Sequence, residues 1–227
     1  MIGIRKIFQN YKSYATAPID KVLSPQQMKD ALKLKANNFN SMYVQNEGAG
    51  KFIMKPLPVI CQLSVLNGMV VDDFNGDGNL DVCISANDYG TDVNDGRYDA
   101  LNGLILKGDG KGNFIPLTML QSGINISGKG KGLAKVTGAN NTYLLVATQN
   151  RGPVQVYKSK MHPEIVPAEA GDVFATITLA NGKKQKIECY YGSSFLSQSG
   201  RFFTVPVGAT SCVITGINGK IREAHIR

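Results

Sequence analysis

The 227-residue sequence lacks tryptophan and has only two histidines and four cysteines. No two cysteines are spaced as Cys-x-x-Cys, which argues against a zinc site or a thioredoxin-type motif. Cys83 lies in an apolar stretch, where a free buried thiol is expected. Cys189 and Cys212 fall on two expected strands of the C-terminal segment, where they either form a disulfide or stay free. His162 and His225 have no nucleophile beside them and are expected at the surface.

Long apolar runs and familiar catalytic motifs are missing as well. No run approaches the ~20 apolar residues that span a bilayer, and the first ten residues lack the apolar core of a signal peptide. The protein is therefore either cytosolic or part of a longer polypeptide that carries its export signal elsewhere. The absence of a Gly-x-Ser-x-Gly elbow, a His-Glu-x-x-His motif and a P-loop disfavours serine hydrolases, zinc proteases and P-loop nucleotide hydrolases.

Acidic residues are fewer than basic ones. The sequence has 17 Asp and Glu and 25 Lys and Arg, which gives a net charge of +8. Such an excess can indicate nucleic acid or an anionic glycan as a partner. The basic residues are scattered, however, and no aromatic residues alternate with them as in RNA-binding modules. We therefore expect a solvated, lysine-rich surface and no nucleic-acid partner.

Glycine is abundant, with 25 residues beside 9 prolines, which favours a turn-rich β protein over a helical one. One short helix is expected near the N-terminus, over 25–35. Ser24 is a suitable N-cap, Pro25 fits the first helical turn, and Gln27 stands where a capping box places it. The remainder of the chain is expected to form strands and turns.

The most specific pattern is the stretch Asp-Phe-Asn-Gly-Asp-Gly-Asn-Leu-Asp over 73–81. Oxygen-bearing groups recur there at every second position around two glycines, which permit a tight turn. Calcium takes six to eight oxygens at about 2.3–2.6 Å, and this register can supply most of them. The expected ligands are the side chains of Asp73, Asn75, Asp77 and Asp81 and the backbone carbonyl of Asn79.

The loop is not an EF-hand. Position 12, which carries a bidentate acid in that motif, is Ile84 here, and both flanks have the pattern of strands rather than amphipathic helices. An Asp/Asn/Gly turn without a metal is the alternative. The four oxygen side chains in register favour a calcium loop between two β-strands.

The chain repeats itself from residue 38 onward. The stretches 41–52 and 103–114 each combine a strand, a Gly-x-Gly turn and a strand that opens with Phe. A second strand–loop–strand pattern follows over 133–150, with Asn140 and Asn141 where the first copy has carboxylates, so no calcium is expected in that loop. Four short strands per unit, separated by glycine turns, are typical of β-propeller blades.

A polar insert, 88–99, follows the second strand of the calcium loop. It contains four aspartates, one arginine and two tyrosines. Tyrosine rings and an arginine fork suit sugars or protein surfaces, so we expect ligand contacts from Tyr89, Arg97 and Tyr98. A solvated polar loop without a binding role is the alternative.

The pattern changes after Pro163 and Pro167, and we place a domain boundary near 160–168. Asn181-Gly182 and Asn218-Gly219 are strong hairpin turns between alternating apolar segments. The expected strands of this small antiparallel domain cover 173–179, 184–191, 201–205, 212–215 and 221–226.

The calcium loop, the Gly-Asp-Gly-Lys-Gly-Asn-Phe turn at 108–114 and their repetition resemble FG-GAP/VCBS repeats, which build integrin-type β-propellers with calcium in the blade loops. The last 60 residues resemble the ASPIC/UnbV domain, on the Asn181-Gly182 hairpin, the stretch 192–198, and Val213-Ile214 before the Asn218-Gly219 turn. Where that domain often has Trp-Pro-x-Gly, this chain has Gly-Ile-Asn-Gly, so a role tied to the tryptophan does not carry over.

The resemblance implies an all-β fold. A segment with one short helix would cover 1–37, a partial β-propeller 38–162, and an ASPIC/UnbV-like antiparallel domain 168–227. A closed propeller needs about 4–8 blades, of which about two and a half are recognisable. The resemblance therefore implies the C-terminal part of a larger bacterial surface protein, with further blades on the N-terminal side.

By the same resemblance the protein is extracellular, on the outer surface or periplasmic. We expect a non-catalytic, calcium-stabilised module for binding, adhesion or scaffolding that recognises a glycan or a protein. The alternative is a glycan-active enzyme, or its accessory domain, that uses acids of the insert. These are Asp88, Asp92, Asp95 and Asp99, which share one loop, whereas catalytic pairs usually stand on separate rigid elements.

Overall fold

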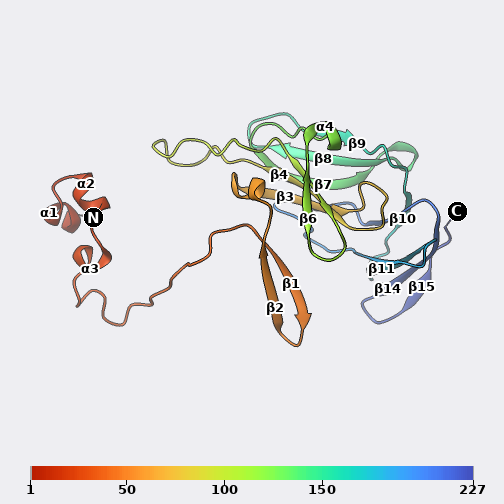
Figure 1. The fold of residues 1–227 in the computed structure, drawn as a ribbon, viewed down its shortest axis with the longest axis horizontal. Helices are drawn as coiled ribbons and strands as arrows, with labels where there is room; N and C mark the ends of the chain where they lie inside the picture. The colour runs from red at the N-terminus through yellow and green to blue at the C-terminus, as the bar shows by residue number, and fades with distance from the viewer. Residues whose placement is uncertain (1, 227) are drawn as a thin grey trace. The chain divides into compact units, whose positions relative to one another are not determined.

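The computed structural model describes residues 2–226, and the chain divides into two compact units, Met1–Phe39 and Asn40–Arg227. The first unit contains three short helices, α1 (Ile2–Ile7), α2 (Tyr11–Ala15) and α3 (Ile19–Val22) (Figure 1). No helix among the described residues is long and apolar enough to cross a membrane. The strands, and the candidate site between them, belong to the second unit.

The predicted helix over 25–35 is wrong, although its capping contacts form. The N–H of Ser24 donates to Gln27 Oε1 (2.9 Å), and the N–H of Gln27 donates to Ser24 Oγ (3.3 Å). The residues that follow form turns and then a stretch without regular structure, in which Leu32 and Leu34 are 84% and 85% exposed. A short helix depends on burial of its apolar face, and these leucines bury little of their surface.

The second unit consists of short antiparallel strands joined by turns. Their bounds are β1 (Met42–Gly48), β2 (Lys51–Pro56), β3 (Leu66–Asp72), β4 (Asp81–Ala86), β5 (Leu104–Gly108), β6 (Phe114–Leu117), β7 (Gly130–Thr137), β8 (Tyr143–Gln149), β9 (Gln155–Lys158), β10 (Glu164–Pro167), β11 (Asp172–Leu179), β12 (Lys184–Glu188), β13 (Phe202–Val205), β14 (Ala209–Gly216) and β15 (Ile221–Glu223). Three short helical turns connect some of them, namely η1 (Val59–Gln62), α4 (Met119–Ser122) and η2 (Ala139–Asn141).

Strands β3 to β6 form one four-stranded sheet in sequential order, and β7 to β9 form a three-stranded sheet of the same kind. The segments predicted over 41–52, 103–114 and 133–150 are confirmed as the hairpins β1–β2, β5–β6 and β7–β8. The fold of the second unit is therefore mostly β, as expected. Within residues 2–226 the sheets stay separate, and they close into neither a barrel nor a propeller.

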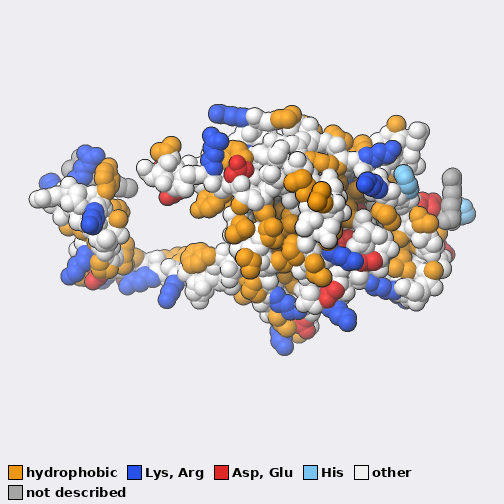
Figure 2. All heavy atoms as spheres, turned by 45° about the horizontal axis from the view of Figure 1, so that its top comes forward, with side chains coloured by type: hydrophobic (Ala, Val, Ile, Leu, Met, Phe, Trp, Pro, Cys, Tyr) orange, Lys and Arg blue, Asp and Glu red, His pale blue; other side chains and the backbone are white. Residues whose placement is uncertain are grey.

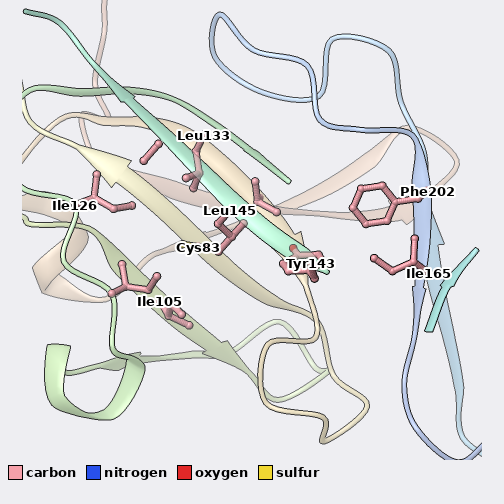
Figure 3. Close-up of a cluster of buried hydrophobic side chains, with 11 residues drawn as sticks. Cys83, Ile105, Ile126, Leu133, Tyr143, Leu145, Ile165 and Phe202 are labelled. Atoms are coloured by element: carbon pink, nitrogen blue, oxygen red, sulfur yellow. The ribbon is translucent and has the colours of Figure 1, made fainter. Parts of the chain in front are cut away.

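The sheets β3–β6 and β7–β9 enclose a first core (Figure 3). Their strands approach closely at Gly68 of β3, where a Cβ atom would lie 2.5 Å from the backbone nitrogen of Leu133 in β7. The buried members of this core are Val70, Cys83, Ile105, Ile124, Ile126, Leu133, Tyr143, Leu145, Ala147, Ile165 and Phe202. A smaller cluster, Cys61, Ile84, Leu104 and Leu106, joins β4 and β5 to η1.

The C-terminal strands form a four-stranded antiparallel sheet in the order β12-β11-β14-β15, beside a two-stranded sheet β10–β13. The two predicted Asn-Gly hairpins are confirmed, since β11 pairs with β12 and β14 with β15. Gly182 and Gly219 have φ of +80° and +75°, which glycine adopts at little cost. The core of these sheets contains Val166, Ala175, Ile177, Ile187, Phe203, Val205, Cys212, Ile214 and Ala224.

The two C-terminal cysteines are free and do not form a disulfide. Cys212 lies opposite Ile177 on one edge of β11, whereas the N–H of Cys189 bonds to the carbonyl of Val173 on the other edge. Strand β11 therefore separates the two thiols, and their partners are ~13 Å apart along it at ~3.3 Å per residue. That separation is too large for a disulfide.

The C-terminal sheets share side chains with the sheets that precede them. Ile165 of β10 and Phe202 of β13 belong to the first core, and Leu80 packs against the core of the C-terminal sheet. The predicted boundary near 160–168 is thus crossed by buried contacts in both directions.

The connection between β12 and β13 covers the free edges of β3 and β7. Ser194 Oγ accepts the N–H of Met69 in β3 (2.6 Å), and Ser199 Oγ accepts the N–H of Lys135 in β7 (3.1 Å). The N–H of Gly200 donates to the carbonyl of Lys135 (2.7 Å). Unpaired backbone groups at sheet edges invite association, and this connection satisfies several of them within the chain.

Charged and apolar side chains are mixed on the surface. Figure 2 shows Lys and Arg spread over several elements of the second unit, without gathering into one patch on the visible face. The β1–β2 hairpin carries exposed apolar residues on one face. Val44 lies opposite Met54, and Phe52 lies two residues before Met54 on the same face of β2.

Candidate metal loop and polar insert

The loop 73–81 connects β3 to β4 at one end of the four-stranded sheet. Its flanks are strands, as predicted. Gly76 and Gly78 have φ of +75° and +79°, the left-handed region that glycine adopts without a Cβ clash. The chain can therefore fold back between Asp73 and Asp81 within nine residues.

The oxygens of the first half of the loop are held by the loop's own N–H groups. Asp73 accepts hydrogen bonds from Gly76 (2.7 Å, Oδ1) and Gly78 (2.8 Å, Oδ2). Asn75 Oδ1 accepts the N–H of Asp77 (2.8 Å), and Asp77 Oδ1 accepts the N–H of Asn79 (2.9 Å). The side chains of Asp73, Asn75 and Asp77 are thus folded over the loop's own backbone.

Asp81 closes the loop from a buried position. It is 1% exposed, and its two oxygens accept the N–H groups of Phe74 (3.1 Å) and Gly108 (2.9 Å). Burial raises the pKa of Asp81 to about 6, and the negative charges of Asp77 and Asp73 add to the increase. The carboxyl group of Asp81 therefore interacts electrostatically with those of Asp77 and Asp73.

Two lysines lie at the rim of the loop. Lys107 Nζ is 3.0 Å from Asp77 Oδ2, and Lys183 Nζ donates to Asn79 Oδ1. Burial opposes ionisation of Asp77, but the N–H of Asn79 and the Lys107 ammonium outweigh it and leave the pKa of Asp77 below its usual value. The loop's oxygens are thus occupied in part by ammonium groups.

The donor set fits a hard divalent cation in its chemistry. All five predicted residues lie in one loop, and each carboxylate oxygen that accepts one N–H keeps a lone pair for another partner. The Lys107 ammonium acts as a stand-in cation at one of these oxygens, Asp77 Oδ2, whereas the Lys183 ammonium lies on the side-chain oxygen of Asn79, beside the backbone carbonyl that is the predicted ligand. Among residues 2–226, no three side chains of the His, Cys, Asp and Glu types gather closely enough to hold a metal ion, so coordination would require the carboxylates to turn further inward.

The two apolar residues of the loop anchor it in different cores. Phe74 packs against the first core, with its ring centroid 6.4 Å from that of Tyr143 in an edge-to-face contact. Leu80 packs against the core of the C-terminal sheet. The loop therefore sits at the junction of the two cores, a position that its sequence did not reveal.

Sequence reasoning also missed a buried ion pair beside the loop. Lys135 Nζ is 2.9 Å from Asp72 Oδ2, and the two residues are 8% and 2% exposed. The hydroxyls of Thr204 and Tyr143 donate to the same carboxylate. Burial and the charge of Asp72 raise the pKa of Tyr143 well above its usual value. The sequence did indicate the burial of Lys135, because it lies two residues from Leu133 on β7 and therefore on the same, buried face of the strand.

Lys135 also faces solvent at one point, where it lines a cleft of about 270 Å³ between β3 and β12. Most of the lining is apolar, including Met69, Val71 and Ile187. The cleft has no counterpart among the sites that the sequence predicted.

The insert 88–99 forms a hairpin-like finger. Asp88 and Tyr98 exchange two backbone hydrogen bonds of 2.9 Å. The buried Asn87 fixes the base, since its Nδ2 donates to Asp99 Oδ1 (3.1 Å) and its Oδ1 accepts the N–H of Leu101 (3.0 Å). Asn87 adopts φ of +81°, which turns the chain into the finger.

Two of the three predicted ligand residues contact each other. The Arg97 guanidinium lies 5.1 Å from the centroid of the Tyr89 ring, and the Tyr89 hydroxyl donates to Asp99 Oδ1 (2.6 Å). That hydrogen bond raises the pKa of Tyr89. Tyr98 is 47% exposed. The three side chains thus share one finger, with Tyr89 and Arg97 preorganised as a stack.

Two acids of the insert, Asp88 and Asp92, have separate partners. Asp88 Oδ1 is 2.8 Å from Lys129 Nζ and 3.8 Å from Lys131 Nζ, and Lys129 lowers its pKa. Asp92 accepts hydrogen bonds from the backbone and side chain of Asn94 in the turn of the finger. Asp88 is thus a lysine-bound carboxylate at the base of the finger, and Asp92 is a turn-forming one.

The second loop, between β7 and β8, is built differently. η2 spans it, and Asn140 and Asn141 adopt φ of +57° and +54°. Its tip carries amide side chains where the first loop has carboxylates, which leaves less negative charge for a cation. The expectation that no calcium binds there stays a prediction.

No model of a known protein family matches the chain, and no curated protein matches it.

Proposed function

We propose that the chain is a non-catalytic, calcium-stabilised β module that binds a glycan or a protein, within a bacterial protein that is extracellular, on the outer surface or periplasmic. The observation that carries this proposal is the loop 73–81. Five oxygen-bearing residues alternate there around two left-handed glycines, at the junction of two hydrophobic cores.

Each residue of the loop has a defined part in this proposal. Asp73, Asp77 and Asp81 contribute charge, Asn75 its amide oxygen and Asn79 its carbonyl. Calcium, when bound, supplies positive charge that offsets the mutual repulsion of the carboxylates. Because Phe74 and Leu80 lie in different cores, an ordered loop also fixes the first core relative to the C-terminal sheet.

The finger 88–99 is the proposed binding surface. It follows β4 directly, so a rigid loop at one end of that strand supports the finger at the other end. A tyrosine face with an arginine stacked on it offers flat apolar area and hydrogen-bond donors together. Sugars and protein surfaces both present complementary groups.

The proposed calcium site is tested by isothermal titration calorimetry. Asp77→Ala removes a charged ligand and should weaken calcium binding more than tenfold, by ~1.4 kcal/mol or more. Asp95→Ala, in the exposed finger, serves as the control and should leave the affinity unchanged. Equal affinity in the wild type and Asp77→Ala would rule out the site.

The proposed binding surface is tested on a glycan array and by pull-down from a bacterial surface extract, each with and without calcium. Replacing Tyr89, Arg97 and Tyr98 together with Ala should abolish binding while leaving the melting temperature nearly unchanged. If that triple variant binds normally, the finger is only a solvated loop.

We also propose that further propeller blades pack beside the β1–β2 hairpin in a longer polypeptide. The support is the hairpin's apolar face, on which Val44, Phe52 and Met54 are 51%, 58% and 63% exposed. Hydrogen exchange of the β1 amides should then be slower in the longer polypeptide than in this chain. Equal exchange rates would contradict the proposal.

A further inference from the structure

The two lysines at the calcium loop come from different sheets. Lys107 belongs to β5, in the sheet that contains the loop, and its ammonium lies on Asp77 Oδ2. Lys183 belongs to the turn between β11 and β12, in the C-terminal sheet, and its ammonium lies on Asn79 Oδ1. The loop thus receives a positive charge from each side of the junction at which it sits.

Packing holds Lys183 in this position. Its carbonyl accepts the N–H of Leu179 (2.9 Å), and Leu179 lies so close to the loop that a Cβ atom on Gly78 would be 2.4 Å from Leu179 Cδ1. Lys184, the next residue, is exposed and makes no hydrogen bond or ion pair to the loop within the described part of the chain. The contact of Lys183 is therefore specific to its place in the turn.

The charge of the loop decides what these lysines do. Three carboxylates contribute up to three negative charges, and the two ammonium groups offset two of them. An entering divalent cation meets a weaker field and must also compete with Lys107 for Asp77 Oδ2. A unit charge ~7 Å from a divalent ion changes its affinity roughly five- to tenfold in water-like surroundings, and less in high salt.

We propose that Lys107 and Lys183 are tethered counter-cations that lower the affinity of the loop for calcium, and that calcium on the backbone carbonyl of Asn79 repels the Lys183 ammonium and releases it from the side-chain oxygen of the same residue. Through this release the metal state of the loop reaches the β11–β12 turn of the C-terminal sheet. The inference rests on the proposed calcium site and adds its regulation by the chain's own ammonium groups.

The affinity part is tested by calorimetry with calcium on the full chain. Lys107→Met and Lys183→Met keep the aliphatic stem and remove the charge, and each should tighten binding about fivefold. Lys184→Met removes a charge of the same sign next to Lys183, outside the contact, and should change the affinity less than twofold.

The release of Lys183 is tested by hydrogen exchange followed by mass spectrometry. Calcium should accelerate exchange of the amides around 179–184 in the wild-type protein, because the turn loses its tie to the loop. In Lys183→Met the same amides should exchange rapidly with or without calcium. The coupling is reciprocal. If calcium weakens the contact between Lys183 and Asn79, that contact weakens calcium binding by the same factor.

The outcomes separate this inference from the calcium site itself. If the wild type binds calcium and the Met variants bind with unchanged or weaker affinity, the counter-cation role is wrong and the site stands. If only the Met variants bind, the lysines suppress the site more strongly than estimated, in support of the inference. If no variant binds calcium, the inference falls together with the site.

Discussion

At the scale of single residues, the pair Asp72–Lys135 stands out because it is a charge pair in the interior. The carboxylate has four donors, from Lys135, Tyr143, Thr204 and the N–H of Asp73. The Lys135 ammonium also lies 5.1 Å from the centroid of the Phe202 ring. Buried ion pairs add little net stability, but a broken pair leaves one uncompensated charge in the interior.

Lys135→Met should therefore destabilise the second unit by about 3–5 kcal/mol, as measured by urea unfolding. Lys131→Met, at a half-buried lysine four residues earlier on β7, is the matched control and should cost under ~1 kcal/mol. The double variant Asp72→Leu with Lys135→Met should recover much of the loss. Equal midpoints for Lys135→Met and Lys131→Met would show that the buried pair is not formed in solution.

A second residue-scale prediction concerns pH. Burial opposes ionisation of Asp172, but hydrogen bonds from Arg222 (2.6 Å) and from the N–H of Glu169 (2.8 Å) outweigh it, and the pKa of Asp172 is lowered. A carboxylate with a lowered pKa in the folded state stabilises the fold above its unfolded pKa of ~3.9. This contribution is lost as the pH falls through the lower, folded pKa.

The melting temperature of the wild type should therefore fall as the pH drops below about 4. Asp172→Asn should be less stable at pH 7, and its melting temperature should change less over the acid range. Asp95→Asn in the exposed finger provides a comparison for a surface carboxylate. If the melting temperatures of the wild type and Asp172→Asn change in parallel with pH, Asp172 does not contribute to the acid sensitivity of the fold.

At the scale of elements, the β12–β13 connection forms hydrogen bonds with the free edges of β3 and β7, as a neighbouring strand does inside a sheet. Its serines accept N–H groups from both edges, and Ser197 Oγ donates to the carbonyl of Leu133 (3.2 Å). The two bonds differ in surroundings, since that of Ser199 is buried and that of Ser194 is exposed. Water can replace Ser194 as the acceptor at the exposed bond, but it cannot replace Ser199 at the buried one.

Ser199→Ala should accordingly cost about 1–3 kcal/mol of unfolding free energy, because the N–H of Lys135 is left buried without an acceptor. Ser194→Ala, the same chemical change at an exposed bond, should cost under ~1 kcal/mol. Chemical denaturation of both variants gives the comparison. A larger loss for Ser194→Ala would mean that the edge of β3, not that of β7, depends on this connection.

At the scale of the whole molecule, the second unit folds around cores that draw on distant parts of the chain. Val166 of β10 lies in the core of the C-terminal sheet, and Leu80 packs against it. A fragment limited to 168–227 lacks both side chains and the pairing partner of β13.

That fragment should be largely unfolded by circular dichroism, alike in calcium and in EDTA, since its own acids form no loop of the 73–81 kind. A fragment of 40–227 retains all three cores and should fold cooperatively. If 168–227 alone shows a sharp unfolding transition, the contacts of Leu80 and Val166 are dispensable.

The local features of this protein could be predicted from its sequence. Strands and hairpins followed from apolar alternation and Asn-Gly turns, which act within a few residues. The tight turn at Gly76 and Gly78 between two strands was readable for the same reason. The failed helix over 25–35 marks the limit, because its cap formed, yet no tertiary partner buried Leu32 and Leu34.

The tertiary structure alone decided the contacts between segments far apart in the sequence. Lys183 is 104 positions from Asn79, and Lys135 is 63 from Asp72. Alternation shows which face of a strand is buried, but it does not show which strand lies across from it. Side chains such as Phe74 and Leu80 are assigned to a core only when the sheets pack, because burial depends on the partner surface as much as on the residue.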